Sequence, residues 1–207
     1  MHLETWLAFL GASALLLVLP GPTILTVISY SITHGRRARL PLVLAVALGD
    51  STALLLSLVG LGALLSASAF WFTVVKTAGG LYLLYLGFKL LRAGVAPATL
   101  PQAGEAGSRW KLFANTYLVT ALNPKGIIFF VAFLPQFIDP AGDTVRQMWI
   151  LSATFVVCAG LNATAYALFA GQARRLLASP RAQRGFNLGG GALLSAAGVW
   201  ALLARRA

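Results

Sequence analysis

Five polar residues stand inside long apolar runs of this 207-residue sequence, at positions where a charge or an amide is costly unless it has a use. Asp50 and Lys76 lie within two of these runs, Asn123 and Lys125 interrupt a later one, and Asn162 lies in the run after that. A carboxylate in such a setting can bind a cation or relay a proton, and an ammonium group can bind a carboxylate. These residue types predict a polar site enclosed by apolar helices.

Prolines interrupt two of the runs, at Pro20-Gly21-Pro22 and at Asn123-Pro124-Lys125. A proline inside a helix lacks a backbone donor and clashes with the preceding turn, so each stretch predicts a broken helix. A pair of broken apolar helices is the sequence feature that marks the central site of a secondary transporter. The half-helix that starts near Pro124 would direct free backbone N–H groups and the Lys125 ammonium toward a carboxylate.

Each of these residues also has a structural interpretation. Asp50 could form an ion pair with Lys76 or Lys125 inside the bundle, and Lys76 could extend to the membrane surface instead. Asn162 is better explained by an interhelical hydrogen bond than by contact with a substrate. The proline breaks could be ordinary kinks, because neighbouring helices repair the lost hydrogen bonds in membranes.

The composition indicates an all-α integral membrane protein. Hydrophobic residues make up 58% of the sequence and charged residues 10%, whereas a soluble chain carries about 25% charged residues. The mean hydropathy is +0.81, and the apolar runs reach the length that a bilayer core demands of a helix. The net charge of +11 is explained by the Lys and Arg residues that membrane proteins collect in cytoplasmic loops. We therefore expect a lipid bilayer around the chain and no nucleic-acid partner.

The apolar runs predict six transmembrane helices, separated by basic, Gly-rich or Pro-rich loops. The first and fourth of these helices contain the proline breaks. The predicted helices are Trp6–Ile28, Leu40–Leu65, Ala69–Leu91, Leu112–Ile138, Met148–Phe169 and Phe186–Leu203.

Two halves of three helices are predicted from features that recur along the chain. Gly79-Gly80 and Gly87 of the third helix recur as Gly190-Gly191 and Gly198 of the sixth, at one constant offset. Halves with an odd number of spans must be inverted relative to each other. The halves cover residues 1–93 and 110–207 of a single integral membrane domain, 1–207, and are joined by a loop rich in Gly, Ala and Pro at 94–109.

The orientation follows from the distribution of basic residues. The loops after the first, third and fifth helices carry three, four and four Lys or Arg residues, eleven in all. The opposite side carries Arg146, Arg205 and Arg206. Because cytoplasmic loops are enriched in Lys and Arg, we expect the three basic loops in the cytoplasm and both termini outside.

The sequence resembles the LysE/RhtB family of bacterial amino-acid exporters along essentially its whole length. The resemblance is carried by Pro20-Gly21-Pro22, by Gly49-Asp50, by Asn123-Pro124-Lys125 and by Phe133-Leu134-Pro135-Gln136-Phe137. It implies a multi-pass protein of the bacterial plasma membrane that exports an amino acid or a close derivative, with protons as the coupling ion. Combining the resemblance with the residues themselves, we expect Lys125 to receive the substrate carboxylate and Asp50 to receive its α-ammonium group or to exchange with a proton. The break at Pro20–Pro22 would lend backbone carbonyls. Neither the residues nor the resemblance decides between a monomer and a homodimer.

Besides a purely structural membrane scaffold, two other classes of function are open to this sequence. The first is an efflux carrier for a metal or other small cation, but one intramembrane acid and no cysteine cluster make a poor ligand set. The second is an intramembrane enzyme. A thiol oxidoreductase needs two cysteines, and Cys158 is the only one. An aspartyl protease needs a second intramembrane acid besides Asp50. A metalloprotease needs an HExxH-type site, which the sequence lacks. We therefore expect no enzyme activity, no cofactor and no metal site.

Overall fold

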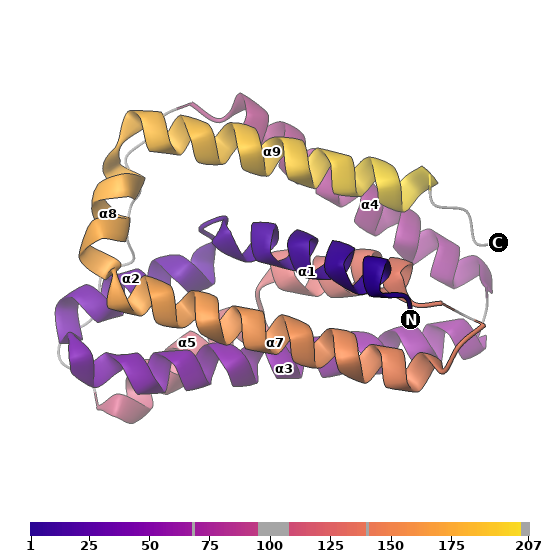
Figure 1. Ribbon diagram of the computed structural model, residues 1–207, viewed down its shortest axis with the longest axis horizontal. Helices are drawn as coiled ribbons and strands as arrows, with labels where there is room; N and C mark the ends of the chain where they lie inside the picture. The colour runs from indigo at the N-terminus through magenta and orange to yellow at the C-terminus, as the bar shows by residue number, and fades with distance from the viewer. Residues whose placement is uncertain (68, 95–107, 140, 204–207) are drawn as a thin grey trace.

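The computed structural model describes residues 1–67, 69–94, 108–139 and 141–203, and every regular element within them is a helix (Figure 1). The all-α prediction is therefore confirmed for this part of the chain. The elements in chain order are α1 (Leu3–Val18), α2 (Pro22–His34), α3 (Arg36–Ala67), α4 (Ala69–Arg92), α5 (Arg109–Ala121), α6 (Pro124–Ile128), the π-helix η1 (Phe129–Phe133), the 3-10 helix η2 (Leu134–Phe137), α7 (Thr144–Leu168), α8 (Ala170–Ala178) and α9 (Pro180–Leu203).

Three helical segments of the described chain are long and apolar enough to cross a membrane: Arg36–Gly60, Arg109–Phe137 and Thr144–Leu168. Helices α1 and α2 pass the same test together, which makes four spans if this bent pair is one of them. The chain is thus a membrane protein, as its composition predicts. In Figure 1, α4 and α9 run along the same long axis as these segments, but the count of six spans stays a prediction.

The first predicted break separates α1 from α2. Helix α1 ends at Val18, Gly21 is the N-cap of α2, and Pro22 is its first residue. A proline is tolerated there because the first N–H groups of a helix have no partner within the helix. Leu19, the C-cap of α1, is extended with φ −68° and ψ 115°, and the two helix axes differ by 54°. The break is therefore a sharp bend.

The second predicted break separates α5 from α6. Helix α5 ends at Ala121 and α6 begins at Pro124, again with proline at the first helical position. The backbone N–H of Lys125 donates a 3.1 Å hydrogen bond to the side-chain oxygen of Asn123, the N-cap. The segment then continues as α6, η1 and η2 instead of one regular helix.

Reciprocal glycine pairs hold α4 against α9, the helix it contacts most. A Cβ on Gly198 would lie 2.7 Å from the carbonyl oxygen of Gly80, and a Cβ on Gly191 would lie 2.7 Å from that of Gly87. These distances to backbone atoms are too short for any side chain, so the backbones can approach this closely only because residues 191 and 198 are glycines. These glycines therefore form the packing surface between α4 and α9.

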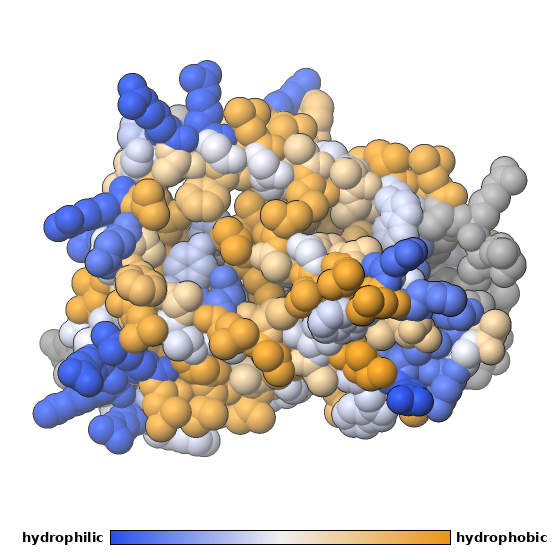
Figure 2. All heavy atoms as spheres, in the orientation of Figure 1, coloured by the Kyte–Doolittle hydropathy of each residue, from blue (hydrophilic) through white to orange (hydrophobic). Residues whose placement is uncertain are grey.

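Basic helix ends gather at one end of the molecule, and this is where the turn from α2 to α3, the end of α4, the start of α5 and helix α8 lie (Figure 1). Helix α8 was not predicted as a helix, because its nine residues lie in a basic segment between two apolar runs. The start of α1 and the end of α9 lie at the opposite end. Figure 2 shows hydrophilic side chains mainly at the two ends and apolar surface over much of the band between them.

Candidate functional site

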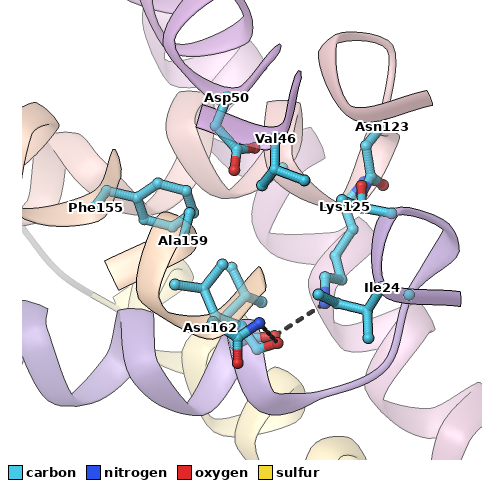
Figure 3. A pocket seen from close by; sticks show the side chains of 13 residues that line it. Ile24, Val46, Asp50, Asn123, Lys125, Phe155, Ala159 and Asn162 are labelled. Carbon is cyan, nitrogen blue, oxygen red and sulfur yellow. Dashed lines mark hydrogen bonds between the residues drawn. The ribbon is translucent and has the colours of Figure 1, made fainter. Parts of the chain in front are cut away.

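A cavity lies where the two helix breaks meet α3 and α7. Five residues proposed from sequence contribute to its lining (Figure 3): Gly21, Asp50, Asn123, Lys125 and Asn162. The cavity offers about 30 Å³, which is room for about two water molecules and too little for an amino acid. The remaining wall is mostly apolar, and includes Leu16, Ile24, Val46 and Phe155.

Lys125 directs its ammonium group at the C-terminal end of α1. Its Nζ donates hydrogen bonds to the carbonyl oxygens of Leu16 and Leu19, both at 2.9 Å. The last carbonyls of a helix have no intrahelical partner and carry the negative end of the helix dipole, so they are a favourable place for a cation. Gly21 lies next to this ammonium, because a Cβ added to it would be 3.5 Å from the same Nζ.

Two side chains of α7 bind the carbonyl oxygens of α1 that Lys125 does not contact. Asn162 donates its amide N–H to the carbonyl oxygen of Leu17 at 3.0 Å, and the Tyr166 hydroxyl donates to that of Val18 at 2.8 Å. The interhelical hydrogen bond predicted for Asn162 is confirmed, although this residue also lines the cavity. Tyr166 was missed from sequence, because a tyrosine in an apolar run is more often a core or interface residue.

Asn123 connects the two breaks. Its side-chain amide donates to the hydroxyl of Thr23, the second residue of α2, at 3.1 Å. Its side-chain oxygen accepts from the backbone N–H of Lys125. The expectation of free backbone donors at the start of α6 therefore needs correction, since this donor already has a partner within the chain. At the start of α6, the main donor available to a carboxylate is therefore the Lys125 ammonium group and not the backbone.

Asp50 lies on α3 with 8% of its surface exposed. Figure 3 shows its carboxylate directed into the cavity, while Lys125 extends toward the end of α1. The ion pair of Asp50 with Lys125 that the sequence allowed is therefore not formed, and both residues belong to the described chain. The backbone of α3 lies close to α5 at the preceding residue, because a Cβ on Gly49 would lie 2.7 Å from Thr120 Cβ.

The other predicted site residues lie at the breaks or beyond the described side chains. Pro20 lies between α1 and α2, and Pro22 and Pro124 are the first residues of α2 and α6. Lys76 belongs to α4, but its side chain is outside the described part of the structure. Among the described residues, no three His, Cys, Asp or Glu side chains gather in a way that could hold a metal ion.

Comparison with known proteins adds the following matches. The model of a family described as LysE type translocator matches residues 14–205. A homoserine/homoserine lactone efflux protein of Salmonella typhimurium is 33% identical over 207 residues, which cover the whole of both chains. An uncharacterized membrane protein of Vibrio cholerae is 32% identical over 90% of this chain and 91% of that protein. A leucine efflux protein of an Enterobacter species is 30% identical over 82% of this chain and 80% of that protein. No solved structure gives a significant match.

Proposed function

We propose that this chain, which belongs to the LysE type translocator family, is a secondary-active exporter that moves an amino acid or a close derivative out of the bacterial cytoplasm. Relatives that align over most of the chain are named for efflux of homoserine, homoserine lactone and leucine. Because the family consists of translocators, we assign the chain as a transporter and not as an enzyme. The observation that carries the proposal is the single cavity that an acid, a lysine and both helix breaks share.

The substrate binds, in this proposal, through its two charged ends. An ammonium group has three N–H donors, and two of those on Lys125 are used by Leu16 and Leu19. The third N–H group donates to the substrate carboxylate. Asp50, whose carboxylate faces the cavity, receives the α-ammonium group or exchanges it for a proton. Export coupled to proton entry then follows, since one acid cannot hold both cations at once.

Alternating access supplies the movement. The present cavity has room for about two water molecules, so a substrate enters only after the surrounding helices move apart. In our proposal the two inverted halves rock about the site, as in other carriers with repeated halves. The basic end of the bundle faces the cytoplasm and both termini face outward across the inner membrane.

Whole-cell export tests the function. Cells that express the protein are loaded with a panel of dipeptides that includes leucine-containing ones, and separately with homoserine. Free amino acids outside the cells are followed with and without a protonophore. We expect one or a few of them to appear faster than from empty-vector cells, and the protonophore to stop this gain.

Two outcomes would contradict parts of the proposal. Export at the empty-vector rate for the whole panel, with the protein present in the membrane, would overturn the amino-acid assignment. Export that continues unchanged with the protonophore would leave the exporter assignment in place and overturn the proton coupling.

A further inference from the structure

The C-terminal end of α1 is held entirely by side chains of other elements. The four successive carbonyl oxygens from Leu16 to Leu19 all accept hydrogen bonds, from Lys125, Asn162 and Tyr166. Helices commonly end in a left-handed glycine whose backbone N–H satisfies such carbonyls. Here the chain leaves α1 in an extended conformation at Leu19 instead. The end of α1 therefore depends on tertiary hydrogen bonds.

The two α7 residues form a clasp on α1. Asn162 and Tyr166 are four residues apart on one helix, so they lie on the same face one turn apart. They bind the adjacent carbonyls of Leu17 and Val18. The Tyr166 hydroxyl reaches α1 from outside the cavity, since Tyr166 is not among the residues that line it. Its contribution is thus to the position of α1 and not to contact with a substrate.

We propose that Tyr166, with Asn162, is a positioning residue for transport, which clasps the end of α1 to α7 so that the Lys125 ammonium stays on the α1 carbonyls and the cavity stays too small for a substrate. Opening the cavity requires the clasp to release, after which α1 can swing at the bend that follows Val18. Only the statement that this movement of α1 is a step of transport rests on the proposed function.

The energies suit a reversible clasp. A single interhelical hydrogen bond in a membrane protein contributes on average about 0.6 kcal/mol, with a maximum near 1.7 kcal/mol. Loss of the Tyr166 bond should therefore raise the population of the open state by about threefold for a bond of average strength, and by no more than about eighteenfold. Lys125 and Tyr166 hold the same turn of α1, so the effects of removing each should not be additive.

The test measures how often the cavity opens. In a Cys158→Ser background, Val46→Cys places a thiol on the cavity wall without overpacking, because cysteine is the smaller residue. The purified full-length protein in detergent is alkylated with a maleimide and no substrate is added. We expect Tyr166→Phe to speed alkylation at position 46 by about threefold, and by no more than about eighteenfold.

Tyr117→Phe is the matched control. It removes the same kind of bond, between the Tyr117 hydroxyl and the Thr52 hydroxyl at 3.0 Å, where α5 meets α3 away from the end of α1. We expect this variant to leave the alkylation rate unchanged. In a Lys125→Met background, where the turn is already loosened, Tyr166→Phe should add less than it does in the parent protein.

The clasp is overturned if Tyr166→Phe leaves the alkylation rate at the parent value, or if Tyr117→Phe raises it equally. Full additivity of Tyr166→Phe with Lys125→Met would also overturn it. Because the assay needs no substrate, its result is separate from that of the export assay. A chain that exports nothing could still show the clasp, and an exporter could lack it.

Discussion

Asp50 and Lys125 share one small cavity without forming an ion pair. Buried charges are normally compensated by a partner. The Lys125 ammonium finds its compensation in two carbonyls at the negative end of α1, so the carboxylate of Asp50 remains directed at the cavity. A cation or proton that arrives there meets a carboxylate that the chain's own lysine does not occupy.

Replacing that carboxylate gives the sharpest prediction for a single residue. Asp50→Asn keeps the shape of the side chain and removes its charge and its capacity to carry a proton. We expect export to fall to the level of empty-vector cells, with the protein still folded in the membrane. Export rate per amount of membrane protein is the measurement, and thermal unfolding in detergent checks the fold.

Asp143→Asn is the matched control for this substitution. Asp143 is exposed, and its carboxylate caps α7 by accepting from the backbone N–H of Arg146. Asparagine caps a helix about as well as aspartate, so this variant should export at the parent rate. Retained export in Asp50→Asn would remove Asp50 from the mechanism.

Sequence alone located most of this site but not its bonding. Gly21, Asn123 and Lys125 were found because prolines interrupt the apolar runs beside them, and because an amide or a charge is costly inside an apolar helix. The direction of the Lys125 side chain was not predictable, since Asp50 and the end of α1 were both plausible targets. Tyr166 escaped because its role depends on a carbonyl far away in sequence, and no local pattern reports such a contact.

Among the elements, the two breaks and the glycine helices were predictable, because proline and small residues act on the backbone directly. The irregular turns of η1 and the short helix α8 were not, since neither has a distinctive residue pattern. Gly80 pairs with Gly198 and Gly87 with Gly191, so α4 and α9 run antiparallel with matching contacts. This pairing supports the inverted-repeat prediction, which itself remains a prediction.

The glycine contact predicts a large cost for one methyl group. Gly198→Ala would place a Cβ 2.7 Å from the carbonyl oxygen of Gly80, a backbone atom that cannot turn aside. We expect it to lower the free energy of unfolding by about 1–3 kcal/mol, measured by thermal unfolding in detergent.

Gly189→Ala on the same helix is the comparison, because nothing lies within 4 Å of the added Cβ. Alanine favours a helix over glycine by about 1 kcal/mol, so this variant should unfold at an equal or higher temperature. Equal stability losses in the two variants would contradict close packing between α4 and α9.

On the scale of the whole molecule, the basic end predicts the orientation in the membrane. In Cys158→Ser cells we place one cysteine at Gln172 on α8 or at Ala141 in the turn before α7, both exposed positions. A membrane-impermeant maleimide should label Ala141→Cys in intact cells and Gln172→Cys only after permeabilisation. The reverse pattern would invert the topology, and with it the direction assigned to transport.

The reciprocal glycine pairs also bear on the ancestry of the chain. Exchanging α4 with α9 maps each pair onto the other, so the contact is isologous, like the interface of a two-fold symmetric dimer. Two copies of a shorter ancestor, inserted in opposite directions and each with one such glycine helix, would bury the same faces against each other. A gene duplication that joined two such copies would need a linker between them, but no new interface.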